Sequence, residues 1–245
     1  MTDSSQDAQQ PWSWRCLHCR GPLAADERGL SCTACGKHYP RIAAIPLLVR
    51  EPAAYLRSEL AQLTRTSHEA HRRKDSLEKI GRDAGLPDQS LDRHRDVLNT
   101  EIAQAETLLA LLEGAAEALA DDTGAGSSAR PPSGWTTESL IPYLIRDWTS
   151  TTELEAVSAR IGAALEQSFP DPSGKSVVFA ACGAGGLLAE MATGFERVVG
   201  FDLTLPILRA ARHLLDGKSL DIALPRASHP AGRITLRKRD ARPVG

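Results

Sequence analysis

The stretch VVFAACGAGGLLAEMATGFERVVGFD, Val177–Asp202, decides the fold predicted for this chain. It begins with an unbroken apolar run, as in a strand buried on both faces, and a glycine-rich turn follows at Gly183 and Gly185. A segment with helical spacing comes next, and Arg197–Phe201 then reads as a second buried strand that Asp202 ends. In such a unit an acid roughly 20 residues after the glycines reaches the ribose hydroxyls of a bound nucleoside. We expect a nucleoside-binding α/β unit; the alternative is an ordinary α/β crossover with a tight turn.

The spacing of the glycines favours one class of nucleoside. It does not fit the G-x-G-x-x-G pattern of dinucleotide binders. Ala181-Cys182-Gly183-Ala184-Gly185 instead resembles motif I, GxGxG, of the class I S-adenosylmethionine (SAM) methyltransferases, with Ala181 in place of the first glycine. The resemblance implies that Ala181, Gly183 and Gly185 line the cofactor and that Asp202 holds its ribose. Phe179 stands where that family usually has an acid.

A second resemblance covers residues 135–215. Arg146-Asp147-Trp148, then Phe169-Pro170, then the glycine turn resemble the carnosine N-methyltransferase family, which carries Arg-Asp-Trp-Ser and Phe-Pro at these relative places. The resemblance implies methyl transfer to a nitrogen, such as the imidazole of a histidine-containing small molecule or peptide. It also implies that Arg146 lies near the SAM carboxylate, whereas the alternative for Arg146 is a salt bridge with Asp147 or a neighbouring helix end.

The segment after Asp202 continues this pattern. Pro206–Leu215 predicts a helix, and Gly232–Arg239 predicts a third strand that Asp240 follows. By the same resemblance Asp240 meets the adenine amino group of SAM. Only three of the seven strands of the methyltransferase fold are expected, so the predicted fold is an incomplete Rossmann-like α/β domain. The open edge of its first strand predicts a protein partner or a homo-oligomer that covers it.

Two C-x-x-C pairs near the N-terminus predict a metal site. Each pair makes a tight knuckle, and four thiolates that converge on one ion complete a tetrahedral structural zinc site. The expected ligands are Cys16, Cys19, Cys32 and Cys35. Gly21 and Gly36, just after the two pairs, are expected to supply turns with positive φ. His18 and His38 lie nearby, but four thiolates already fill the site.

The segment Lys37–Leu48 carries a further resemblance. Its Tyr39-Pro40, then Ile45-Pro46, then Leu resemble the zinc ribbons of a small family of methyltransferase activators. A similar ribbon begins the bacterial ribosomal-RNA guanine methyltransferases. A ribbon of this size buries little core, so metal binding supplies its folding free energy, on the order of 10 kcal/mol or more.

The chain of 245 residues has room for several parts. Helical periodicity between residues 51 and 122 is interrupted at Gly85–Asp88, and Leu140–Trp148 and Glu153–Phe169 predict two more helices. The expected parts are a disordered tail (1–11), a zinc ribbon (12–50), a helical region (51–122), a linker (123–134) and a partial SAM-binding methyltransferase domain (135–245).

Charge and composition restrict the partners. The 29 basic and 31 acidic residues nearly balance, so nothing in the overall charge favours nucleic acid or an anionic membrane as a partner, and we expect a cytoplasmic protein that does not bind a membrane. The basic run His68–Lys74 is interpreted as a solvated helix face rather than an RNA contact. The sequence thus predicts a SAM-dependent methyltransferase-like protein with a small-molecule or peptide substrate. The alternatives are a non-catalytic zinc-ribbon adaptor that binds or activates a partner, and an RNA methyltransferase.

Overall fold

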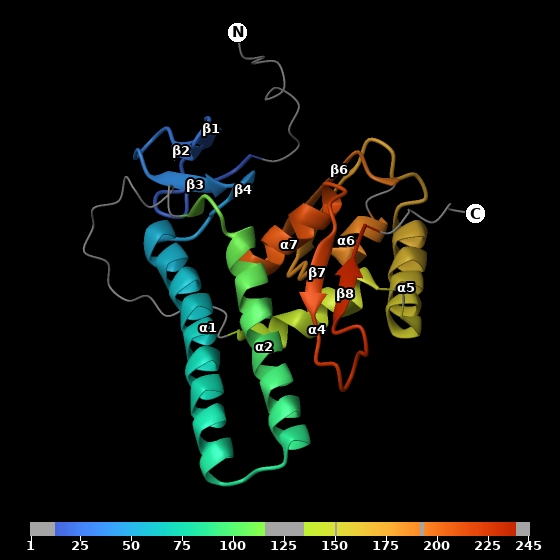
Figure 1. Cartoon of the computed structure of the whole chain (residues 1–245). Helices are drawn as coiled ribbons and strands as arrows, with labels where there is room; N and C mark the ends of the chain where they lie inside the picture. Colours follow the sequence, from blue (N-terminus) through green and yellow to red (C-terminus); the bar gives the residue numbers. More distant parts are fainter. Residues whose placement is uncertain (1–12, 116–134, 150, 192–193, 239–245) are drawn as a thin grey trace. The chain divides into compact units, whose positions relative to one another are not determined.

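The computed structural model describes residues 13–115, 135–149, 151–191 and 194–238 (Figure 1). The expected tail (1–11), the expected linker (123–134) and Asp240 lie outside these ranges. The chain divides into two compact units, one with residues 1–56 and 114–129 and the other with residues 57–113 and 130–245. None of the helices in the described ranges has the length and apolar character needed to cross a membrane.

The first unit is built on a four-stranded antiparallel sheet whose strands follow one another in sequence. They are β1 (Leu23–Ala25), β2 (Gly29–Cys32), β3 (His38–Ile42) and β4 (Ile45–Pro46). Short turns suffice for this order because antiparallel neighbours need few linking residues. Leu30 and Tyr39, paired across β2 and β3, are buried together with Cys16 and Cys32. Such a small core needs a further source of stability.

The second unit begins with two long helices, α1 (Pro52–Asp83) and α2 (Asp88–Leu111). All of α1 from Arg57 onward belongs to this unit. The turn between them contains Gly85 with φ +63, so the break predicted at this point is confirmed. The helices run antiparallel (Figure 1), and an ion pair of 3.5 Å joins Arg95 of α2 to Glu78 of α1.

The remainder of the second unit is mixed α/β. Its next elements are α4 (Thr137–Trp148), α5 (Thr152–Ser168), β5 (Ser176–Ala180), α6 (Gly186–Met191), β6 (Arg197–Phe201) and α7 (Leu205–Leu215). β5 and β6 pair in parallel, with Val178 opposite Val199, and α6 belongs to the crossover that a parallel pair requires. The strand–turn–helix–strand unit predicted at Val177–Asp202 is therefore present.

The third predicted strand does not have the expected partner. It forms as β8 (Arg233–Leu236), but it pairs antiparallel with β7 (Leu220–Ala223), a strand that the sequence analysis did not predict. The nine residues between the two strands are too few for a parallel crossover but enough for a hairpin. Within the described residues the parallel sheet contains β5 and β6 alone, so a Rossmann-like methyltransferase sheet stays a prediction.

The hairpin of β7 and β8 and helix α7 are attached to α2. The Gln104 amide donates to the carbonyl oxygen of Ala223 at 2.8 Å, and the Arg209 guanidinium donates to that of Leu111 at 2.6 Å. α7 also buries an apolar face that includes Leu214. These contacts make α2 the element on which this part of the second unit is assembled.

Candidate functional site

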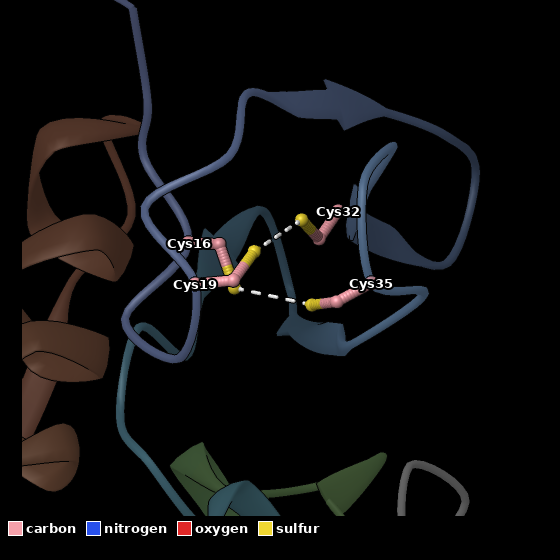
Figure 2. A group of neighbouring side chains, drawn as sticks. All are labelled: Cys16, Cys19, Cys32 and Cys35. Carbon is pink, nitrogen blue, oxygen red and sulfur yellow. Dashed lines mark hydrogen bonds between the residues drawn. The ribbon is translucent and has the colours of Figure 1, made fainter.

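The four cysteines of the first unit come together as one cluster (Figure 2). All four sulfur atoms lie within 4.8 Å of one another. The Sγ atoms of Cys16 and Cys35 are 3.7 Å apart, and those of Cys19 and Cys32 are 3.4 Å apart. A zinc–sulfur distance of about 2.3 Å gives a tetrahedron with edges of about 3.8 Å, whereas a disulfide is about 2.05 Å long. The four cysteines form no disulfide, and the spacing of their sulfurs fits tetrahedral coordination of one metal ion.

The two knuckles have the same backbone structure. In each, the N–H of the first cysteine, Cys16 or Cys32, donates at 2.9 Å to the carbonyl five residues later. The N–H four residues after that cysteine donates back to its own carbonyl, also at 2.9 Å. The backbone therefore fixes both pairs of sulfurs in place.

The glycines have different roles in the two knuckles. In the second knuckle Gly36 has the expected positive φ, +71. In the first knuckle the residue with positive φ is Arg20, at +61, and Gly21 does not have a positive φ. Gly21 is needed for space, because a Cβ there would lie 2.8 Å from the Cβ of Ala34 and 3.2 Å from the Sγ atoms of both Cys19 and Cys32. The prediction of positive φ at Gly21 was wrong, since the tight turn is one residue earlier.

Tyr39 supports the cluster, a role that the sequence analysis did not predict. Its side chain is fully buried, and its hydroxyl lies 3.2 Å from the Sγ of Cys16. The same hydroxyl accepts a hydrogen bond of 2.9 Å from the N–H of Leu17. A buried tyrosine usually finds a partner for its hydroxyl. Tyr39 and Ile42 are the two buried positions of β3, and a large aromatic residue in so small a unit is the signal that points to it.

The charges of the thiols favour a cation at the cluster. Burial raises the pKa of Cys16, but hydrogen bonds from Tyr39 and from nearby backbone amides outweigh it and bring the pKa to about 6. For Cys35 a backbone hydrogen bond from Lys37 lowers the pKa, but the neighbouring sulfurs and burial raise it to about 12. Beside the other sulfurs the Cys35 thiol therefore keeps its proton unless a metal ion compensates the negative charge.

The two nearby histidines do not belong to the cluster. The residues that can hold a metal ion in the described part of this unit are the four cysteines. His38 is exposed, and its Nδ1 lies 3.0 Å from the hydroxyl of Ser31, which also donates to Asp26. The site is thus a closed set of four sulfurs with no open coordination position, as in structural zinc centres.

The glycine-rich loop of the second unit follows β5. Ala181 has φ +54, Gly183 φ +55 and Gly185 φ +79. The carboxylate of Asp202, just after β6, accepts hydrogen bonds from the N–H groups of Gly183 at 2.9 Å and Thr204 at 3.0 Å. The structure therefore brings Ala181, Gly183, Gly185 and Asp202 together at the carboxyl ends of the two parallel strands, where ligands of α/β sheets bind.

Helix α4 ends against this loop. The indole N–H of Trp148 donates to the carbonyl oxygen of Ala184 at 2.7 Å, and both residues are buried. A Cβ on Gly186 would lie 2.1 Å from the carbonyl oxygen of Asp147, so only glycine permits this approach. Asp147 also lies close to Gly183, because its Oδ2 is 4.0 Å from the place of a Cβ there.

Arg146 forms the salt bridge that was the alternative to a contact with SAM. Its guanidinium donates to Asp147 Oδ1 at 2.7 and 3.0 Å and lies 4.9 Å from the ring centroid of Tyr143. The side chain of Arg146 is nearly half exposed.

Cys182 lies inside the loop, in surroundings that disfavour its thiolate form. Burial raises its pKa to about 11, and the negative charges of Asp202 and Asp147 add to the effect. The thiol therefore stays protonated at neutral pH. It packs against β6, where a Cβ on Gly200 would lie 2.8 Å from its sulfur.

No family model and no curated protein matches this chain. A methyltransferase function therefore stays a prediction from the sequence, whereas the candidate metal site is supported by the geometry of the cysteine cluster.

Proposed function

We propose that this protein is a SAM-dependent methyltransferase-like protein whose N-terminal unit is folded around structural zinc. The proposal is supported chiefly by the position of Asp202, whose carboxylate lies beside Gly183 at the carboxyl ends of β5 and β6. A carboxylate has about four lone-pair sites. Two of them accept the backbone N–H groups, which leaves acceptors for the two hydroxyls of a ribose.

The conformation of Ala181 also supports SAM binding. This alanine stands where motif I of the methyltransferases has its first glycine, and its φ of +54 is one that glycine adopts more easily. A side chain that accepts this conformation at a cost of about 1 kcal/mol indicates a backbone shape fixed by its surroundings.

The spacing of the glycines favours SAM over a dinucleotide, because it resembles motif I of the methyltransferases and does not fit G-x-G-x-x-G. SAM carries a positive sulfonium, from which a methyl group passes to a nucleophile such as a nitrogen. In such a reaction Asp202 would hold the ribose, the loop from Ala181 to Gly185 would admit the amino-acid part, and the protein would position the acceptor in line.

Calorimetric titration with SAM tests the proposal. Replacement of Asp202 by Ala removes the ribose acceptors, and hydrogen bonds to a charged group are strong enough that affinity should fall by about tenfold or more. Asp171→Ala is the matched control, since Asp171 likewise accepts an N–H two residues on, from Ser173 at 3.0 Å, but lies outside the loop. Equal affinity of the wild type and Asp202→Ala would place the nucleoside elsewhere.

The contacts of α4 favour a second candidate function, a non-catalytic adaptor. Trp148 already donates to the Ala184 carbonyl, and Asp147 packs against Gly186, so the loop is held as a structural turn would be. Val178, Phe201 and Leu203 are large apolar residues that stay exposed at or beside the two-stranded sheet, where a partner could cover them. Saturating SAM that releases no heat and does not raise the unfolding temperature would favour this candidate.

A further inference from the structure

A cavity of about 320 Å³ lies in the first unit, beside the cysteine knuckles. Its volume is at the lower end of the range for small-molecule sites, about 300–1,000 Å³, so a ligand here would be small. Three segments of the first unit form the wall: the first knuckle (Leu17 and His18), the start of β3 (Lys37, just before it, and Tyr39) and the residues before α1 (Arg50 and Glu51).

Two of the nitrogen-bearing side chains in this wall are exposed and lack a partner within the protein. The guanidinium of Arg50 forms no ion pair or hydrogen bond with any residue that the structure describes. The imidazole of His18 is likewise without a contact of this kind among the described residues. A guanidinium presents a rigid fork of N–H donors that matches the oxygens of an anion. The cavity therefore offers donors that an external anion can use.

The third basic residue of the wall, Lys37, has a weak partner. Its Nζ lies 3.7 Å from Oε1 of Glu51, and the side chain of Glu51 is 74% exposed. An exposed ion pair of this kind contributes little to stability, so a ligand anion can displace the carboxylate of Glu51 from Lys37. The wall thus carries two cations, Lys37 and Arg50, against one acid, which leaves a net positive charge.

Two neighbouring structures add charges of opposite sign. α1 begins at Pro52, directly after Glu51, and has no acid in its first turn, so its N-terminus contributes about half a positive charge. Four thiolates around Zn²⁺ would carry two negative charges, which oppose an anion in the cavity. Backbone amides of the knuckles compensate part of that charge, as where the N–H of His18 donates to the Sγ of Cys16 at 3.4 Å. We therefore expect an anion to bind in about the millimolar range.

We propose that this cavity binds the phosphate group of a small organic phosphate monoester. An arginine fork and a lysine point charge are groups with which proteins commonly hold phosphate. The terminal oxygens of a monoester provide acceptors for Arg50, Lys37 and His18 together, whereas a carboxylate has only two oxygens. Leu17, which is 45% exposed in the same wall, offers apolar surface to the organic part. The site does not involve SAM, so it stands or fails independently of the proposed methyltransferase function.

An NMR titration of the zinc-loaded full chain with three aromatic probes tests the chemistry. Phenyl phosphate, benzoate and benzyl alcohol share a ring and differ in the group attached to it. We expect phenyl phosphate to shift the amide signals of Leu17, His18 and Lys37 with a Kd of about 1–10 mM. Benzoate should bind more weakly, and benzyl alcohol should leave these signals in place. The proposal would be overturned if phenyl phosphate left them unchanged, or if benzoate or benzyl alcohol bound as tightly as phenyl phosphate.

Three variants of exposed residues locate the site. Arg50→Gln removes the fork of donors and should weaken the binding of phenyl phosphate by about tenfold. Glu51→Gln removes the acid that competes for Lys37 and should tighten binding by about two- to fivefold. Arg41→Gln is the matched control, because Arg41 is an exposed arginine of β3 outside the cavity wall, and affinity should change by less than about twofold. Wild-type affinity in Arg50→Gln, an equal loss in Arg41→Gln, or no gain in Glu51→Gln would show that the phosphate is not held in this cavity.

Discussion

Replacement of Tyr39 by Phe isolates the contribution of one hydroxyl to the metal centre. The ring stays in the core, but the hydrogen bond to the Cys16 sulfur, at 3.2 Å, and the acceptor for the Leu17 N–H, at 2.9 Å, are both lost. A hydrogen bond to a charged group is worth about 1.5–3 kcal/mol, and an unsatisfied buried donor costs about 1–3 kcal/mol more. Because Leu17 is 45% exposed, we expect water to replace the hydroxyl at its amide, so only the first of these two contributions is counted.

The expected loss is therefore about 2 kcal/mol, or about 30-fold in zinc affinity. Competition against a chromophoric chelator at neutral pH measures this affinity. Tyr143→Phe is the matched control, since Tyr143 lies in the second unit and its ring, which faces Arg146, is kept. A zinc affinity of Tyr39→Phe equal to that of the control would refute the role of the hydroxyl at the cluster.

Two further predictions concern the second unit. Gly186→Ala should lower the free energy of unfolding by about 1–3 kcal/mol, because its Cβ would lie 2.1 Å from the Asp147 carbonyl oxygen. The control is Gly162→Ala on α5, where a Cβ meets open space, and it should raise the free energy of unfolding by about 0.5–1 kcal/mol. Denaturant titrations in which both variants shift this free energy in the same direction would contradict the packing described. Burial raises the pKa of Glu59 to about 7, although hydrogen bonds from the Trp135 indole lower it. The folded state thus holds a proton that the unfolded state releases near pH 4.5, so the stability from this group is present below that pH and is lost as pH rises to 7. In the wild type this loss lowers the free energy of unfolding by on the order of 3 kcal/mol between these pH values, and Glu59→Gln should abolish it. If the variant kept the pH dependence of the wild type, the raised pKa of Glu59 would be wrong.

The parts of the structure that the sequence predicted are those set by local pattern. The two C-x-x-C pairs fix their own knuckles, so the cysteine cluster follows from spacing alone. The Gly85–Asp88 break separates two helices because glycine and proline end helical periodicity. The run of β5, loop, α6 and β6 is similarly local, since a parallel pair and its crossover form one short segment.

The features that the sequence did not predict depend on contacts between distant segments. β7 is only four residues long, and its burial depends on β8 and α2, so its own pattern is too short to identify it. The approach of Asp147 to Gly186 joins two segments that are far apart in the chain. At Gly21 the residue type was informative, but its reason was the close approach of Ala34, 2.8 Å from the place of a Cβ, rather than a turn.

Zinc content tests the metal centre most directly. Elemental analysis of protein purified without chelator should find about one zinc per chain, since the four sulfurs form a single site with no room for a second ion. Cys182→Ser, which changes the one cysteine outside the cluster, should keep that zinc, whereas Cys32→Ser should lose most of it and unfold the N-terminal sheet. Less than about half an equivalent in the wild-type protein, or full zinc in Cys32→Ser, would contradict a structural zinc site formed by the four cysteines.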